Sequence, residues 1–240
     1  MNNDSESRYL ININREETNT LCRMIIPEWI RRYIRRYKYR KQFPDSFVSC
    51  YSLTSLEADI SSGCIIRPGC NISSTVKMGK CTTLGDNCLL RGGGKIEIGS
   101  FCSIAPEVVI LSENHNFNYI TTFPLELYKD GENRIYEEFI YADVLIEDDV
   151  WIGQRSIILA GAKIGKGCVI GAGSVVCNGE YQTFSLLAGN PARVVKQRLD
   201  QDTRNAIQSS NWSSKSITHI FNNIFDELHE TSWTKSEKNS

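Results

Sequence analysis

Large aliphatic side chains recur at every sixth position through much of this 240-residue chain. The series runs over residues 60–96, 98–110 and 146–176, and its members are Ile60, Ile66, Ile72, Met78, Leu84, Leu90, Ile96, Ile98, Ile104, Ile110, Ile146, Ile152, Ile158, Ile164, Ile170 and Val176. A spacing of six matches neither the period of a helix nor the simple alternation of a strand. It predicts short strands that are each followed by a corner.

A second, smaller residue recurs four positions after the large one. Its members are Cys64, Cys70, Val76, Thr82, Cys88, Gly94, Cys102, Val108, Val150, Ser156, Ala162, Cys168 and Ser174. One large and one small inward residue in every six suits a narrow triangular solenoid, because large side chains fill the axis and small ones fit near the crowded corners. We expect about five coils, stacked at the usual strand spacing of about 4.8 Å.

This double pattern resembles the hexapeptide repeat of the left-handed parallel β-helix. The left hand is implied by that resemblance and not by the spacing. We therefore expect an all-β left-handed parallel β-helix with helical extensions at both ends. The expected segments are an N-terminal extension over 1–56, the β-helix over 57–198 and a helical tail over 199–240.

The repeat is interrupted by residues 111–143, which are too many for a corner. Insertions of this length in compact folds are usually functional or disordered. This one holds His115, and it is rich in aromatic residues: Phe117, Tyr119, Phe123, Tyr128, Tyr136, Phe139 and Tyr141. We expect an ordered active-site loop.

The nine cysteines are odd in number and form no CxxC pair, which argues against a disulfide framework or a zinc cluster. Five of them occupy the small inward position, where cysteine packs as a small hydrophobic residue. Cys81 and Cys177 lie elsewhere in the repeat and stay open as reactive thiols. No metal cofactor is expected.

Composition adds little to this picture but excludes some partners. The chain is 41% hydrophobic and 23% charged with a net charge of −1, which is typical of a soluble globular protein and gives no reason to expect nucleic acid binding. No apolar run reaches the roughly 20 residues of a membrane helix, and the N-terminus has no secretory signal pattern. The expected location is the cytoplasm.

A solenoid is a scaffold that does not fix a function. A γ-class carbonic anhydrase needs three zinc-binding histidines, but only His115 lies near the repeats, while His219 and His229 lie in the tail. An ice-binding helix needs flat threonine ladders, and a sugar nucleotidyltransferase needs a large domain before the repeats; neither is found. An acyltransferase and a non-catalytic scaffold remain.

Two motifs are more specific. Asn114 and His115 are followed by TTFP inside the inserted loop, and the run DDVWIGQRSIILAGAKIGKGCVIGAGSVV is followed by LAGNPARVVKQRL. With these motifs the chain resembles the hexapeptide acyltransferases, and in particular the xenobiotic acetyltransferase branch that includes streptogramin and type B chloramphenicol acetyltransferases. The resemblance covers residues 57–200.

That resemblance implies an acetyl-CoA-dependent enzyme in which His115 is the general base. An imidazole titrates near neutral pH, so it can take a proton from an acceptor hydroxyl or amine and return it. A backbone N–H would hold the oxyanion. Asn114 would orient the ring or the acceptor, or would only shape a turn.

The resemblance also implies a homotrimer with the coenzyme in a groove between neighbouring helices. The residues that it places at the coenzyme are Trp151, Gly153, Gln154, Ala172, Asn178, Arg193 and Lys196. The first three would line the pantetheine arm, and Arg193 and Lys196 would face phosphates, with a solvated basic surface as the alternative. The chain departs from the family at 177–182, where CNGEYQ contains one extra residue and replaces a basic side chain with Asn178.

Both ends carry helical patterns. Residues 21–43 are basic with interleaved apolar residues, so the predicted helix either caps the open end of the solenoid, contacts an anionic membrane surface peripherally, or meets another partner. In the tail, an apolar stripe at helical spacing predicts a helix that packs on the barrel side or closes the other end; its members are Ile217, Ile220, Phe221, Ile224, Phe225 and Leu228.

The sequence therefore predicts an acetyltransferase that modifies a hydroxyl or amine of a sugar, in surface polysaccharide or nucleotide-sugar synthesis. Acetylation of an antibiotic is the second choice of small-molecule acceptor, and a non-catalytic scaffold is the opposing class. The basic segment 21–43 leaves the inner face of the membrane open as a location.

Overall fold

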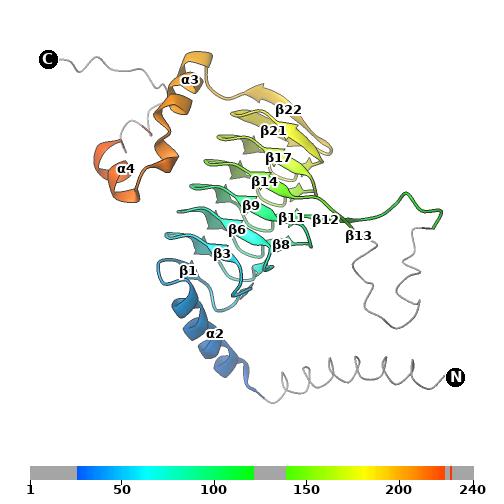
Figure 1. Cartoon of the computed structure of the whole chain (residues 1–240), viewed down its shortest axis with the longest axis vertical. Coiled ribbons are helices and arrows are strands. Elements are labelled where there is room, and N and C mark those ends of the chain that lie inside the picture. The colour runs from blue at the N-terminus through cyan, green and yellow to red at the C-terminus, as the bar shows by residue number, and fades with distance from the viewer. Residues whose placement is uncertain (1–25, 122–138, 225–227, 229–240) are drawn as a thin grey trace.

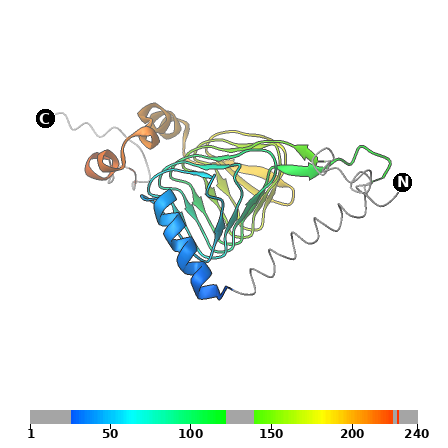
Figure 2. The same cartoon turned by 60° about the horizontal axis from the view of Figure 1, so that its bottom comes forward.

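The computed structural model describes residues 26–121, 139–224 and 228. Short parallel strands stack into a triangular solenoid with three walls (Figures 1 and 2). Some expectations concern parts of the chain outside the described residues; these parts are Cys22, Phe123, Tyr128, Tyr136, Phe225, His229, most of the TTFP motif and the first part of the basic segment.

We name the walls sheets A, B and C. Sheet A contains β1 (Phe47–Val48), β4 (Ile65–Ile66), β7 (Thr83–Leu84), β10 (Ser103–Ile104), β15 (Trp151–Ile152), β18 (Val169–Ile170), β21 (Ser185–Gly189) and the antiparallel β22 (Ala192–Gln197). Sheet B contains β2 (Leu53–Thr54), β5 (Asn71–Ile72), β8 (Leu89–Arg91), β11 (Val109–Leu111), β16 (Ile157–Ile158) and β19 (Val175–Val176). Sheet C contains β3 (Asp59–Ile60), β6 (Val76–Met78), β9 (Ile96–Ile98), β14 (Val144–Ile146), β17 (Ala162–Ile164) and β20 (Gly179–Tyr181). The predicted left-handed parallel β-helix is confirmed.

The number of coils differs from the expectation. Sheets B and C have six strands each, so the described chain forms six coils rather than about five. The solenoid also extends before residue 57, because β1 and β2 pair in parallel with β4 and β5. The inward positions of this first coil are Val48 and Thr54. Threonine interrupts the aliphatic series, so the sequence pattern alone missed this coil.

The predicted core is confirmed. Every large position from Ile66 to Val176 is at most 3% exposed, and only Ile60, near the open end, is partly buried. The five inward cysteines are at most 1% exposed. Their thiols also donate to corner carbonyls of the next coil, as Cys168 does to the Gln182 oxygen at 3.0 Å. Burial raises the pKa of Cys102 to about 12, so its thiol stays protonated at neutral pH.

A helix lies at the N-terminal end of the solenoid. α2 (Glu28–Gln42) runs along one edge of the triangular opening there (Figures 1 and 2). It is attached by Tyr39, whose buried hydroxyl donates to the Ser52 carbonyl and accepts from the Thr54 N–H. Capping by this helix, one of the three expected roles, is therefore observed. No helix among the described ranges is long and apolar enough to cross a membrane.

The tail packs on the side of the solenoid, as one of the two expectations had it. It consists of α3 (Gln201–Ser210), the 3-10 turn η2 (Trp212–Ser214) and α4 (Ile217–Asn223). The Trp212 ring lies 5.0 Å from the Phe101 ring, and the Ser213 hydroxyl donates to Asp148 at 2.6 Å. Both partners lie at the corner between sheets C and A.

Candidate active site

The inserted segment leaves the solenoid as an antiparallel ribbon. Its strands are β12 (Glu113–His115) and β13 (Phe139–Tyr141), and they follow β11 and precede β14 (Figure 1). The ribbon therefore projects from the corner between sheets B and C. His115 is opposite Phe139 in the register, with ring centroids 5.0 Å apart. The imidazole is exposed on a strand of defined geometry rather than on an irregular loop.

The base of the ribbon is fixed by contacts with the coil below. The Gly93 N–H donates to the Glu113 carboxylate at 3.0 Å, and the Lys95 N–H donates to the Asp143 carboxylate at 2.8 Å. The Tyr141 ring lies so close to Gly93 that an added Cβ would be 2.2 Å from it. The sequence expectation included none of these anchors. The sequence feature that could have indicated these anchors is the glycine run 92–94, close to the point where the six-residue spacing of large aliphatic residues is displaced by two positions.

Asn114 has an observed local role. Its side-chain oxygen accepts a hydrogen bond from the His115 backbone N–H at 2.9 Å. This bond is local to the backbone of β12, where Asn114 lies in a strand and not in a turn. In this structure the amide oxygen does not hold the imidazole ring.

Two of the residues expected at the coenzyme lie in one row on the outside of sheet A. The register joins Trp151 to Val169, Val169 to Leu186 and Leu186 to Lys196. Trp151 is 53% exposed and Lys196 is also exposed, so an aromatic surface and a cation occupy the same face. Arg193 is exposed on the same strand as Lys196.

Gly153, Gln154 and Ala172 lie at the corner between sheets A and B. A Cβ on Gly153 would come within 2.6 Å of the Ala172 backbone nitrogen, so the stacking of successive coils requires glycine there. Gln154 is exposed, and its amide donates to Glu107 at 3.2 Å, beside the 2.7 Å ion pair of Glu107 with Arg155. Gly153 therefore has a structural role whatever its contact with a coenzyme.

Asn178 lies at the other corner, with His115. It stacks against Gly161, whose N–H donates to the Ala142 carbonyl just after the ribbon. The predicted site residues thus form two groups within one chain. Asn114, His115 and Asn178 occupy the corner between sheets B and C, whereas the other expected residues occupy sheet A and its corner with sheet B. Sheet B separates the two groups.

Asp149 is an unpredicted titratable group beside this surface. It lies two residues before β15 and is half-buried at the corner between sheets C and A. Burial raises its pKa from 3.8 to about 6, against the opposing effect of Arg198 and Lys166. Since the folded state binds this proton more tightly than the unfolded chain, the contribution of Asp149 to stability is full below about pH 4 and is lost as the pH rises through about 6.

We therefore expect Asp149→Asn to stabilise the protein at neutral pH. A shift of about two units corresponds to at most about 3 kcal/mol, and partial solvent exposure reduces this to about 1–2 kcal/mol. Asparagine also accepts the left-handed φ of +58° at this position. Urea unfolding at pH 7.5 and pH 3.5 checks the cause. A gain of the same size at both pH values would contradict an ionic origin.

Among the described residues, no group of three His, Cys, Asp or Glu side chains could hold a metal ion. In the part of the chain that the structure describes, the exposed polar groups include the imidazole on the ribbon and the cations of β22. This arrangement allows proton transfer at one corner and anion binding on sheet A.

Comparison with known proteins identifies the family. Residues 143–178 match the model described as bacterial transferase hexapeptide (six repeats). A probable macrolide acetyltransferase of Lysinibacillus sphaericus is 33% identical over 138 residues, which make up 55% of this chain and 76% of that protein. A chloramphenicol acetyltransferase of Agrobacterium fabrum (strain C58 / ATCC 33970) is 31% identical over 128 residues, which make up 51% of this chain but only 61% of that relative.

One solved structure supports the fold alone. AntD, an N-acyltransferase from Bacillus cereus, was crystallised with dTDP and 3-hydroxybutyryl-CoA, and it superposes with a TM-score of 0.53 at 24% identity, over 76% of this chain and 96% of AntD. The repeat, the six-coil solenoid with its inserted ribbon, and a relative that is matched over three quarters of its length lead to one assignment. The chain belongs to the hexapeptide-repeat acetyltransferases.

Proposed function

We propose that the protein transfers an acetyl group from acetyl-CoA directly to a hydroxyl or amine. The observation that carries this proposal is the exposed His115, held on an anchored ribbon at a corner of an acetyltransferase solenoid. A non-catalytic scaffold gives no reason to clamp a histidine-bearing ribbon with Glu113 and Asp143. Acetyl-CoA as donor is further supported by the exposed Trp151, Arg193 and Lys196 on one sheet.

In the proposed reaction, an imidazole nitrogen of His115 takes the proton from the acceptor as its oxygen or nitrogen attacks the thioester carbonyl. The tetrahedral intermediate collapses with cleavage of the carbon–sulfur bond. The imidazolium then gives its proton to the departing CoA sulfur. No acyl-enzyme is required. The inward thiols are at most 1% exposed and therefore out of reach of a substrate, and burial also raises the pKa of Cys64 to about 11, which keeps that thiol protonated.

The coenzyme is proposed to lie along sheet A. The Trp151 ring offers an apolar surface for the pantetheine arm, and Arg193 and Lys196 offer charge for phosphates. Gln154 and Ala172 at the adjoining corner are exposed to the same groove. Asn178, by contrast, lies at the same corner as His115, between sheets B and C. Asn178 could therefore contact the coenzyme only from the side of the groove opposite to sheet A.

The separation of the two groups supports a homotrimer. The outward row of sheet C is charged and internally paired, by Lys77 with Asp59 at 3.6 Å and by Lys163 with Glu180 at 2.7 Å. The outward rows of sheets A and B are mostly apolar; they contain Phe47, Ile65, Trp151, Val169 and Leu186 on sheet A, and Leu53, Leu89, Val109, Ile157 and Val175 on sheet B. Three triangular prisms can cover these two walls by packing sheet A of each copy on sheet B of the next.

Such packing would bring the corner between sheets B and C of one copy to sheet A of the next. His115 would then face Trp151 of a neighbouring copy. Co-expression of His115→Ala with Trp151→Arg, each of which should be almost inactive alone, tests this arrangement. Purified mixed assemblies should recover about one third of the wild-type rate, because any trimer that contains both chains has both residues intact at one of its three boundaries. Assemblies that contain both chains but recover nothing would place the whole site within one chain.

The acceptor is proposed to be a sugar hydroxyl or amine used in cytoplasmic polysaccharide or nucleotide-sugar synthesis. The exposed rings of Phe117 and Tyr119 on the ribbon side support it, since aromatic surfaces can pack on sugar rings. Antibiotic acetylation is the second candidate, and the names of the relatives from Lysinibacillus sphaericus and Agrobacterium fabrum favour it.

Thiol release from acetyl-CoA distinguishes these acceptors. The assay uses separate pools of nucleotide amino sugars, simple glycosides, macrolides and chloramphenicol. Turnover with one pool names the acceptor class. Failure of every pool, together with no binding of CoA by calorimetry, would leave only the scaffold.

A further inference from the structure

One face of α2 has no partner among the described residues. Tyr39 and the following Phe43 are buried against the first coil, whereas Trp29, Tyr33 and Tyr37 are 67%, 72% and 66% exposed. These three residues are spaced four apart and form one stripe. Capping therefore explains one side of the helix and leaves an aromatic stripe on another. Large exposed apolar side chains in a row usually mark a binding surface.

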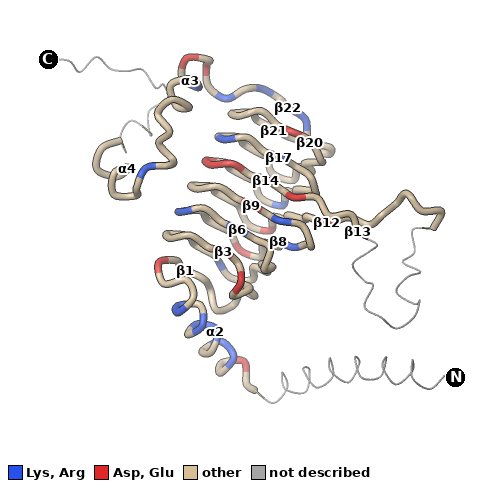
Figure 3. The backbone as a smooth tube through the Cα atoms, in the orientation of Figure 1, with Lys and Arg blue, Asp and Glu red and all other residues tan. Residues whose placement is uncertain are grey.

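The same helix is strongly basic. It contains seven Arg and Lys residues and one acidic residue, Glu28 (Figure 3). Glu28 pairs with Arg31 and Arg35, and the Arg32 guanidinium lies over the Tyr51 ring at 4.9 Å. The other four, which are Arg36, Lys38, Arg40 and Lys41, form no ion pair with any described residue. Arg36, Arg40 and Lys41 follow a tyrosine of the stripe by three or four residues, so these three cations lie on its side of the helix.

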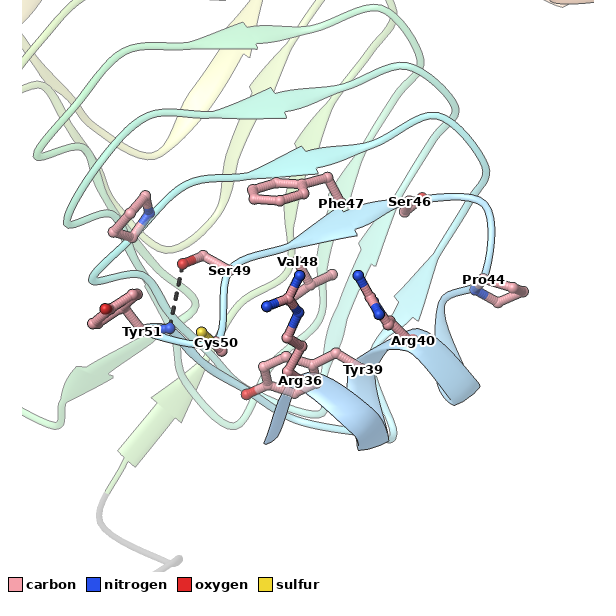
Figure 4. A pocket seen from close by; sticks show the side chains of 11 residues that line it. Arg36, Tyr39, Arg40, Pro44, Ser46, Phe47, Val48, Ser49, Cys50 and Tyr51 are labelled. Carbon is pink, nitrogen blue, oxygen red and sulfur yellow. Dashed lines mark hydrogen bonds between the residues drawn. The ribbon is translucent and has the colours of Figure 1, made fainter. Parts of the chain in front are cut away.

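A crevice of about 470 Å³ lies between the helix and the first coil of the solenoid (Figure 4). Arg36 and Arg40, one helical turn apart on α2, both line this crevice, and Phe47 and Tyr51 line the side formed by the first coil. Two guanidiniums in one crevice with aromatic and hydroxyl groups suit a phosphate that carries an apolar chain. No carboxylate lines this crevice.

We propose that α2 binds an anionic phospholipid surface, with the stripe of Trp29, Tyr33 and Tyr37 at the headgroup boundary and Arg36 and Arg40 on lipid phosphates. Amphipathic helices with aromatic residues beside a basic face bind such interfaces. A second copy of α2 is excluded as the partner by charge repulsion, because each α2 carries seven basic residues and one acidic residue. The proposal holds for a single chain. In the trimer proposed above, three such helices would lie at one end of the assembly and bind the surface together.

Vesicle co-sedimentation of the full chain tests this proposal. Wild type should bind vesicles of equal parts phosphatidylglycerol and phosphatidylcholine, and binding should weaken with added salt. Arg36→Gln with Arg40→Gln should lower the partition constant by roughly thirtyfold, since each cation near an anionic surface contributes about fivefold. The triple variant Trp29→Ser, Tyr33→Ser and Tyr37→Ser should lower the partition constant by roughly tenfold or more.

The matched control is Lys77→Gln with Lys163→Gln, which removes the same charge from the outer row of sheet C. It should bind vesicles like wild type, and all variants should keep the wild-type unfolding midpoint because the changed side chains are exposed. Equal binding to pure phosphatidylcholine, an equal loss in the control, or no sedimentation of wild type would overturn the proposal. Tighter binding to labelled single-stranded DNA at the same salt would also overturn it, in favour of a nucleic acid partner.

Discussion

Replacing His115 with alanine is expected to lower kcat by about 10²–10⁴-fold while the KM for acetyl-CoA changes little. The imidazole is the group that would hold the proton in the transition state, whereas the proposed coenzyme surface lies on another wall of the solenoid. The ring is exposed and contacts Phe139, so its removal leaves no buried cavity and the fold should persist. Thiol release at saturating acetyl-CoA measures the effect.

Two controls make the His115 result specific. His219 is exposed in α4, away from the ribbon, so His219→Ala should retain the wild-type rate. Added imidazole should restore part of the activity of His115→Ala, since a free base can occupy the vacated space. Wild-type turnover in His115→Ala would refute the general base and leave the acetyltransferase fold assignment intact.

The repeat could be predicted because each hexad obeys the same local rule. A large inward side chain must fill the axis in every hexad of the narrow triangle. Each position from Ile66 to Val176 can therefore be recognised in the sequence as a large apolar residue, without knowledge of its neighbours. Where one coil uses a different residue, as the first coil does with Thr54, the rule fails and the coil is missed. The expected count of about five falls short of the observed six because strands of the solenoid lie outside the aliphatic series, such as β1 and β2 before Ile60 and β20 after Val176.

The candidate site could be predicted only in part. His115 was recognisable from its place in an insertion and from the motif around it. The anchoring of the ribbon depends on hydrogen bonds between residues far apart in the sequence, such as the bond from the Lys95 N–H to Asp143. The six-residue repeat gives no information about such pairs. The placement of His115 and Trp151 at different walls likewise follows from the three-sided winding. A sequence motif lists both residues but does not say whether one chain can bring them together.

Coil stability rests on the inward row, and Ile152→Ala tests this with the second largest expected effect. Ile152 is fully buried in β15 and stacks between Ile104 and Ile170. Truncation of a buried isoleucine costs about 2–5 kcal/mol, because it removes buried surface and leaves a cavity. In a solenoid each coil is stabilised only by its neighbours, so a weakened central coil affects both halves. Urea unfolding followed by circular dichroism measures the loss.

The adjacent residue on the same strand supplies the control. Trp151 is the larger side chain but faces outward and is 53% exposed. Trp151→Ala should therefore cost less than about 1 kcal/mol in the isolated chain, although it removes more atoms than Ile152→Ala. If the two variants lost equal stability, the outward row would be buried in the folded protein, which would argue that the assembled trimer rather than the coil itself is the stable unit. A large loss for Ile152 alone would assign stability to the inward row and leave the outward row free to bind coenzyme.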